Sequence, residues 1–264
     1  MIDYTNNILF IDLSYYIFYR FYALCTWIKM SKAECETNMN DEVFKEKYEK
    51  CFFQNIIKLT KLYKVKPDNV IFACDCSRDS IWRKELHPEY KGTRETKDSF
   101  DPHVFIHTHE KLLPILIERH GFKILKCQNA EADDIIGVLT RTITEKYRDT
   151  SITIITNDND YLQLIMNENI KIYNLKKQDL STRSVGNYQK DLLYKILVGD
   201  KSDNIQGLVV NKVAMNLINE CDEDEIESRM IDMDKYEKYL FNKTMIDMRL
   251  IPTEIQDNIK NLLS

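Results

Sequence analysis

Short apolar runs alternate with longer segments of helical period along the first two thirds of the chain. The helical segments include Glu42–Tyr63, His103–His120 and Glu131–Tyr147. The apolar runs are Ile8–Ile11, Val70–Ala73, Phe122–Leu125, Ile152–Ile155 and Ile170–Tyr173. Because predicted strands and helices alternate, the pattern predicts an α/β fold with a mostly parallel central sheet flanked by helices on both faces.

The last third of the chain has a helical pattern and no further strand candidates. Its helical segments are Tyr188–Val198, Asn211–Glu220, Asp234–Asn242 and Glu254–Leu263. We therefore predict a core over residues 1–183 and a helical region over residues 184–264. Residues 77–100 interrupt the sheet pattern and are rich in Arg, Lys, His and Tyr. We expect this segment to be a protruding helical or partly mobile insertion.

Composition narrows the class of protein only slightly. The hydrophobic stretch from Ile8 to Met30 contains Asp12 and Arg20, so a strand followed by a helix is favoured over a membrane span. No secretory signal pattern is found at the N-terminus, and seven Cys without CxxC pairs fit reduced thiols. We expect a cytoplasmic monomer, in the host cytoplasm if the chain is viral. The net charge of −5 does not exclude nucleic-acid binding, which needs a basic face and not a basic average.

Five short acidic motifs stand out from this pattern. The first four each follow a predicted strand closely. Because the carboxyl ends of parallel strands meet at one edge of a sheet, their acids should converge in one crevice. The motifs are ILFIDLS with Asp12, FACDCS with Asp75, AEADD with Glu131, Asp133 and Asp134, TNDND with Asp158 and Asp160, and GDKSDN with Asp200 and Asp203.

Ionised carboxylates gathered in one crevice repel one another and resist desolvation, so cations must neutralise them. Oxygen ligands without nearby His or Cys select hard ions such as Mg²⁺ or Mn²⁺. Two such ions about 4 Å apart can activate a water molecule, bind a scissile phosphate and stabilise the leaving oxygen. The five His lie away from the motifs, and no glycine-rich phosphate-binding loop is present. The chemistry predicted is metal-dependent phosphodiester hydrolysis.

Each acidic motif also has a purely structural reading. Asp12 alone could cap a helix, AEADD could be an acidic helix start, and NDND could form an Asx turn. Five unrelated caps need not lie on one side of a sheet, so the joint pattern favours a shared metal site. In an ideal helix Glu131 and Asp133 point to nearly opposite sides, so they converge only where a loop enters the helix.

Taken in this order, the five motifs resemble the flap endonuclease and 5′→3′ exonuclease superfamily over nearly the whole chain. The segments WRKELHPEYKGTR, GDKSDNI and IDMRLIPTEIQDNI are most similar to its ribonuclease H subgroup from T-even bacteriophages. The resemblance implies a PIN-like nuclease core followed by a helical, helix–three-turn–helix-like region that binds duplex. It implies a 5′→3′ exonuclease and flap endonuclease with ribonuclease H activity that removes RNA primers during DNA replication.

The resemblance also implies a ligand set for two Mg²⁺ or Mn²⁺ ions. The first ion would be bound by Asp12, Asp75, Glu131 and Asp133. Asp158, Asp160 and Asp203 would bind the second ion, and Asp134 and Asp200 would support both sites directly or through water. Implied substrates are DNA and RNA–DNA hybrid with 5′ ends or flaps. A single-strand DNA-binding protein or a sliding clamp would be a further partner.

The basic segment after Asp75 resembles the arch of the family, beside which a 5′ single strand passes. Arg83, Lys91 and Arg94 would then steady the scissile phosphate. Arg78, Lys84 and Tyr90 would contact nucleic acid, through phosphates or by stacking on bases. The alternative is a solvated helix face with Trp82 and Tyr90 in the core.

Four residues outside this segment complete the predicted nucleic-acid interface. Phe18 lies where the family often has an aromatic that stacks on the terminal base, although it could equally be a core residue. Lys201, Gly207 and Lys212 would contact duplex. The family's glycine-rich hairpin is shorter here and retains only Gly207, as in the phage subgroup.

Two other functional classes remain possible at this stage. A catalytically inactive clamp that binds junctions could keep the fold, but it would gain nothing from repelling carboxylates. A metal phosphatase acting on small substrates would have no use for the basic segment.

Overall fold

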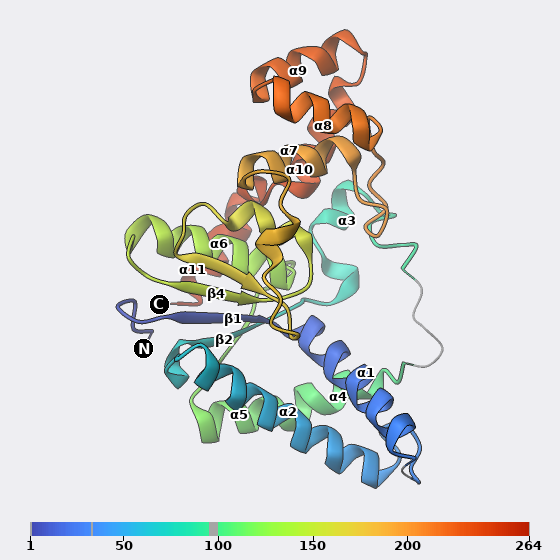
Figure 1. Cartoon of the computed structure of the whole chain (residues 1–264), viewed down its shortest axis with the longest axis vertical. Coiled ribbons are helices and arrows are strands. Elements are labelled where there is room, and N and C mark those ends of the chain that lie inside the picture. Colours follow the sequence, from blue (N-terminus) through green and yellow to red (C-terminus); the bar gives the residue numbers. More distant parts are fainter. Residues whose placement is uncertain (1, 33, 95–99, 264) are drawn as a thin grey trace.

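Five parallel strands form one central sheet in the residues that the computed structural model describes, 2–32, 34–94 and 100–263 (Figure 1). Their order across the sheet is β3-β2-β1-β4-β5, so the chain reverses its direction of winding between β1 and β4. Each neighbouring pair is parallel. The strands are β1 (Ile8–Asp12), β2 (Val70–Cys74), β3 (Lys123–Lys126), β4 (Ile152–Ile155) and β5 (Ile170–Tyr173).

Helices make up most of the remaining described chain. Those before β4 are α1 (Leu13–Ser31), α2 (Glu42–Leu62), α3 (Arg83–Leu86), α4 (His103–His107), α5 (Leu113–His120) and α6 (Ala132–Lys146). Those after β5 are α7 (Tyr188–Val198), α8 (Asn211–Glu220), α9 (Glu223–Asp232), α10 (Tyr236–Ile246) and α11 (Thr253–Asn261). A π-helical turn (Thr108–Leu112) joins α4 to α5.

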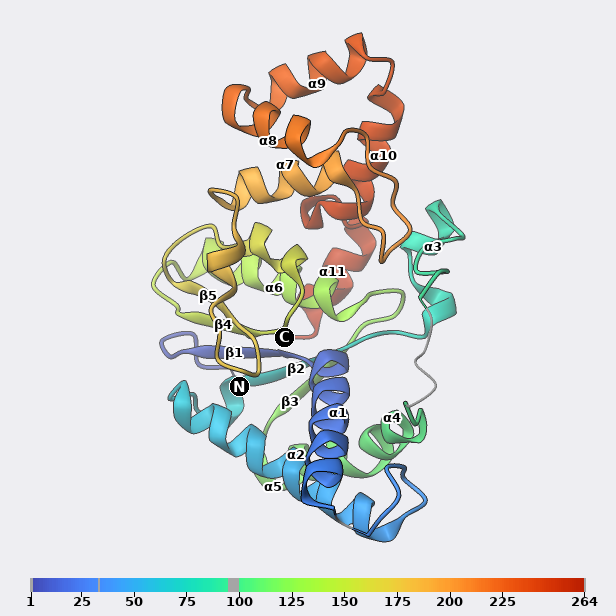
Figure 2. The same ribbon diagram turned by 45° about the vertical axis from the view of Figure 1, so that its right-hand side comes forward.

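The sheet is buried on both faces because its strands are apolar at consecutive positions. Ile8 and Phe10 point to the face covered by α6 and α11, while Leu9 and Ile11 point to the face covered by α1, α2 and α5 (Figure 2). Burial of both faces explains why the strands read as continuous apolar runs. The sheet therefore forms a rigid platform whose carboxyl edge is free to present polar side chains.

A third hydrophobic cluster joins helices α7 to α10 into a separate body beside the sheet. It includes Ile81 and Tyr90 from the segment before α4. The chain then returns to the sheet: Ile255 and Ile259 of α11 belong to the cluster around α6. The last helix thus packs on the core and not on the helical region that precedes it in sequence.

The structure confirms the predicted α/β class and all five strands, within one residue at each end. It differs at three places. The expected single helix His103–His120 contains the π-helical turn, next to Pro114. Helix α9 was not predicted, although Asp222 and Glu225 form a capping box at its start.

The third difference concerns the expected protruding insertion over residues 77–100. Ile81, Trp82 and Tyr90 are buried and anchor this segment: Trp82 belongs to the cluster around α6, and Ile81 and Tyr90 belong to the cluster of the helical region. Residues 77–79, 85–86, 88–89 and 92–94 remain exposed. Residues 95–99, including the basic residue Lys97, lie outside the described part of the chain. Among the described helices, none has the length and apolar character needed to cross a membrane.

Candidate metal centre and active site

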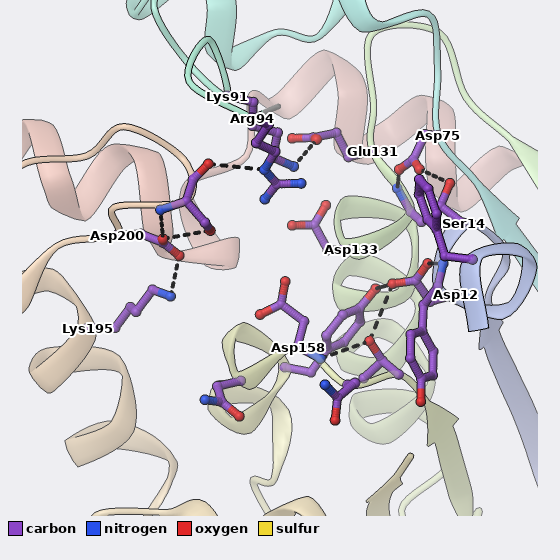
Figure 3. A pocket seen from close by; sticks show the side chains of 18 residues that line it. Asp12, Ser14, Asp75, Lys91, Arg94, Glu131, Asp133, Asp158, Lys195 and Asp200 are labelled. Carbon is purple, nitrogen blue, oxygen red and sulfur yellow. Dashed lines mark hydrogen bonds and ion pairs between the residues drawn. The ribbon is translucent and has the colours of Figure 1, made fainter. Parts of the chain in front are cut away.

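An open cleft of about 550 Å³ lies at the carboxyl edge of the sheet, where β1 and β4 are neighbours. A parallel sheet binds its ligands at such a reversal of winding. Carboxylates from the ends of separate strands line the cleft together with acids from the helical region (Figure 3). The acids that line it are Asp12, Asp75, Glu131, Asp133, Asp158 and Asp200.

Asp12 and Asp75 are held by hydrogen bonds at the ends of β1 and β2. Asp12 caps α1, and its Oδ1 accepts a hydrogen bond from the Tyr15 N–H at 3.0 Å. The Asp75 carboxylate accepts hydrogen bonds from the Ala132 N–H at 2.8 Å and from the Ser14 hydroxyl. The same contacts that end each strand therefore fix both carboxylates toward the cleft.

Glu131 and Asp133 converge because Glu131 is the N-cap of α6 and has extended backbone dihedral angles. Glu131 and Asp133 can converge only if the acidic motif lies where a loop enters a helix. The structure has this arrangement. Glu131 and Asp133 each offer an oxygen within 4.8 Å of the other. Asp133 lies in the middle of the cleft (Figure 3).

A second acidic group comes from the turn after β4 and from the loop after α7. Asp160, Asp200 and Asp203 offer oxygens that lie within 4.8 Å of one another. Asp158 caps the short helix that contains Asp160, whose N–H donates to its carboxylate at 3.0 Å. Acids that are separated by more than forty residues in sequence therefore meet at one end of the cleft.

Cations from other segments partly neutralise both groups. Lys91 Nζ pairs with Glu131, and Arg94 pairs with Asp203. Lys195 Nζ lies 2.6 Å from Asp160 Oδ1 and also pairs with Asp200. All three cations line the cleft, so a phosphate entering it could take over their ion pairs.

Desolvation dominates the protonation of these acids. Burial, with the charge of Asp75 added, raises the pKa of Asp12 to about 7. Burial followed by the Asp133 charge raises the pKa of Glu131 to about 7, and burial followed by the Asp158 charge does the same for Asp160. Near neutral pH these carboxyl groups therefore bind protons more readily than exposed carboxyl groups do, and a bound divalent cation would displace those protons.

The donor set fits hard divalent cations. Its ligand atoms are carboxylate oxygens, and the described cleft residues include no His or Cys. The three local cations leave several carboxylate charges uncompensated in a partly desolvated cleft. Glu131 and Asp133 could hold one ion with Asp12 and Asp75, and Asp158 could hold another with Asp160, Asp200 and Asp203.

Asp134 and Arg83 do not line the cleft, and this corrects the role predicted for Arg83. Asp134 is fully buried, accepts a hydrogen bond from Trp82 Nε1 at 3.0 Å and lies 2.9 Å from Arg83 Nη1. Arg83 is only 3% exposed and also lies 3.2 Å from Glu131 Oε2. Asp134 offers an oxygen within 4.8 Å of oxygens of Glu131 and Asp133, so its predicted support of a metal site stays a prediction. Arg83, paired with Asp134, cannot reach a phosphate in this arrangement. They form an internal ion pair that supports Glu131 from behind.

Tyr90 is also misassigned as a base-stacking residue. Its ring is 2% exposed, and its hydroxyl lies 3.0 Å from Glu131 Oε2 and 3.1 Å from Asp203 Oδ2. The hydroxyl therefore links the two acidic groups. The alternative weighed for Trp82 and Tyr90, that both belong to the core, is correct.

The remaining predicted nucleic-acid residues lie in different places, and all of them except the half-buried Lys84 are exposed. Phe18 is 39% exposed at the cleft, where its ring stands 4.6 Å from that of Phe100. Arg78 lines an adjoining pocket, whereas Lys84 pairs with Asp79 at 3.6 Å away from the cleft. Lys201, Gly207 and Lys212 lie on the helical region around the loop between α7 and α8.

The sequence did not predict the roles that several cleft residues have beside the acids. Lys195 is the cation shared by Asp160 and Asp200, and its position five residues before Asp200, in the last turn of α7, is the one available signal. Thr156 and Tyr161 donate hydrogen bonds to Asp12 at 3.3 and 3.4 Å. Hydroxyl groups at such positions carry no distinctive sequence pattern.

Comparisons with known proteins are consistent with this geometry. Residues 7–192 match the family described as 5′-3′ exonuclease, N-terminal resolvase-like domain. The chain is 29% identical to a 5′-3′ exonuclease of Buchnera aphidicola over 81% of this chain and 71% of that protein. It is 24% identical to the ribonuclease H of Enterobacteria phage T4 over 73% of this chain and 68% of that protein. It spans 16–24% of the length of the DNA polymerase I relatives that it matches, with 24% for the protein from Lactococcus lactis.

A solved structure has the same fold. The bacteriophage T5 flap endonuclease, in a complex with DNA and metal ions, superposes with a TM-score of 0.66 at 17% identity. The alignment covers 97% of this chain and 98% of that one.

We predict that Arg83→Ala lowers the free energy of unfolding by about 3–5 kcal/mol, because it leaves Glu131 and Asp134 buried without their counter-ion. Lys84→Ala should cost at most about 1 kcal/mol, since its partner Asp79 is exposed. Urea unfolding at pH 7.5 measures both values. Equal, small losses would show that Arg83 is not an internal counter-ion.

We predict that the metal-free protein becomes less stable as the pH rises from about 4 to about 7. Asp12, Glu131 and Asp160 titrate at about 7 when folded and at about 4 when unfolded. The folded state therefore binds more protons in this window, and its stability falls with pH. Asp12→Asn should weaken this dependence and raise the Tm in EDTA at pH 7.5 by about 2–4 °C or more. If the Tm of Asp12→Asn differed from the wild-type Tm by the same amount at every pH, Asp12 would not be a source of the pH dependence.

Proposed function

Because the chain belongs to the flap endonuclease and 5′→3′ exonuclease family and is therefore a nuclease, we propose that it is a divalent-metal-dependent enzyme that cleaves phosphodiesters near 5′ ends. The substrates would be RNA–DNA hybrid and branched duplex with 5′ ends or flaps. Two Mg²⁺ or Mn²⁺ ions would serve as cofactors. The biological role would be removal of RNA primers from Okazaki fragments during DNA replication, in a bacteriophage or its host.

One observation carries the proposal: acids from five separate stretches of chain line a single cleft whose rim bears cations. When bound there, divalent cations supply the positive charge and the water activation that phosphodiester hydrolysis requires. Asp12, Asp75, Glu131 and Asp133 would hold one ion, and Asp158, Asp160 and Asp203 the other, supported by Asp200.

Lys91 and Arg94 would act on the substrate itself. Both line the cleft beside Glu131 and Asp203, so they can exchange a carboxylate partner for a phosphate oxygen. Arg94 presents a planar fork of donors suited to phosphate, whereas Lys91 is a compact charge. Burial would lower the pKa of Lys91, but the neighbouring Glu131 and Asp133 charges raise it above its ordinary value. Lys91 therefore stays protonated and serves as a charge, not as a base.

Phe18 and the helical region would position the nucleic acid. Phe18 is exposed at the cleft, where its ring could stack on a terminal base. Lys201 and Lys212 are exposed on the loop and helix that follow α7, where they could bind duplex phosphates. A single-strand DNA-binding protein or sliding clamp would be a further partner, and the enzyme would act as a monomer in the cytoplasm.

The competing proposal is a catalytically inactive clamp on the same fold. Incubation of 5′-labelled RNA–DNA hybrid, flap DNA and nicked duplex with Mg²⁺ or with EDTA separates the two. We expect short 5′-terminal products in Mg²⁺ and none in EDTA. Binding without metal-dependent cleavage of any of the three substrates would establish the clamp instead.

We predict that Asp158→Asn lowers the cleavage rate by about 100-fold or more, because it removes a carboxylate charge from the candidate metal site. Substrate affinity in EDTA should change little. Asp149→Asn is the matched control, since Asp149 is exposed and precedes the amino end of the same strand, β4. Rates that are equal in the two variants, or loss of a cooperative thermal transition in Asp158→Asn, would refute this role.

A further inference from the structure

A second group of cations lies on the segment after β5, which contacts the cleft-lining residues Asn157 and Asn159. Lys176 and Lys177 lie in the turn that follows β5, and Arg183 ends the short helix that comes next. All three side chains are exposed. We refer to Lys176, Lys177 and Arg183 as the basic rim.

Arg183 is fixed against the cleft wall by neutral acceptors. Its Nη2 donates to Asn157 Oδ1 at 3.0 Å, and its Nη1 donates to Asn159 Oδ1 at 3.1 Å. Asn157 and Asn159 line the cleft on either side of Asp158 in the sequence. The guanidinium group is therefore only one side chain away from the cleft.

The charge of Arg183 has no carboxylate counter-ion among the residues that the structure describes. This distinguishes it from Lys91, Arg94 and Lys195, each of which pairs with an acid of the cleft. An Arg held in place by amide oxygens keeps its full charge and part of its donor fork for an external anion.

The turn that carries the two lysines is anchored to the same residue as Arg183. Asn174 Nδ2 lies 3.5 Å from Asn157 Oδ1, and Asn174 Oδ1 accepts the Lys176 N–H at 2.9 Å. Lys177 has a left-handed backbone with φ of 64°, which directs the chain back toward Asp179. Asp179 is the local acid, and its carboxylate accepts a hydrogen bond from the Ser181 N–H at 2.8 Å and forms no ion pair with the rim.

We infer that the basic rim binds the phosphodiester backbone of the nucleic acid on the Asp158 side of the cleft. Lys91 and Arg94 lie on the other side of the cleft, with Asp133 between them and Asp158 (Figure 3). A polyanion that approaches an acidic cleft needs cations on both flanks, because bound metal ions act only at its centre. This inference deepens the proposed function and rests on it for the identity of the ligand.

The alternative role for Arg183 is mechanical support of the Asn157–Asn159 turn. Two substitutions separate charge from support. Arg183→Lys retains the charge but loses the fork, whereas Arg183→Gln retains a hydrogen-bond donor but loses the charge. Arg119→Ala is the matched control, because Arg119 is exposed on α5, just before the amino end of β3.

The experiment measures fluorescence anisotropy of a labelled DNA duplex with a 5′ single-stranded tail, in EDTA, between 50 and 200 mM salt. It is repeated with an RNA–DNA hybrid of the same sequence. We expect Arg183→Ala and Arg183→Gln to weaken binding about 3- to 10-fold and to reduce the salt slope by about one. Arg183→Lys and Arg119→Ala should stay close to wild type on both duplexes.

Three outcomes would overturn the inference. The first is an unchanged salt slope in Arg183→Ala. The second is wild-type binding by Arg183→Gln together with a loss in Arg183→Lys, which assigns a supporting role. The third is a loss confined to the hybrid, which assigns a contact to ribose and not to phosphate. The assay needs no cleavage, so the two proposals can fail separately. If the wild-type protein cleaved no substrate but bound DNA with a salt slope that depends on Arg183, the proposed function would be wrong and the inference about the basic rim would stand.

Discussion

Repulsion among carboxylates in a partly desolvated cleft is the constraint on which the rest of the structure depends. At least six acids line one cleft, and desolvation raises the pKa of Asp12, Glu131 and Asp160 to about 7. No polypeptide places these charges together without compensation. The protein compensates in two ways, with fixed cations from its own chain and with an open cleft whose oxygen ligands suit divalent ions. The first offsets part of the repulsion within the chain itself, and the second leaves carboxylate charge that a divalent cation could neutralise.

The fixed cations also determine how the two parts of the molecule meet. Arg83 donates to the Met245 carbonyl at 2.9 Å while it pairs with Glu131 and Asp134. On the other acidic group, Gln163 Nε2 donates to the carbonyls of Asp160 and Ile246. The end of α10 is thus attached behind both acidic groups. Because α11 packs on the sheet core directly after α10, this packing also helps to hold the acids of the candidate site in position.

The sequence predicts the parts of this arrangement that depend on local pattern. Buried parallel strands require continuous apolar residues, and their carboxyl ends necessarily meet, so the convergence of Asp12, Asp75 and Asp158 follows from order along the chain. The direction in which a side chain points within the site does not follow from the order of residues along the chain. Arg83, Tyr90 and Asp134 belong to polar motifs, yet tertiary packing turns them inward. There Arg83 pairs with Asp134, and the Tyr90 hydroxyl donates to Glu131 and Asp203. A cation that binds phosphate and one that neutralises a buried acid look alike in sequence.

The net charge is a second property of the sequence that does not reveal how side chains are arranged in the site. The value of −5 averages over an acidic cleft, a basic segment beside it and a basic rim on its far side. Cations that already pair with acids of the cleft, such as Lys91 and Arg94, attract a polyanion only weakly. Their attraction grows when a substrate phosphate takes the place of the paired acid. Arg183 differs because its partners are amides, so its field is felt before the substrate docks. On the inference drawn above, uncompensated cations at the border, and not the total charge, would decide where nucleic acid first contacts this protein.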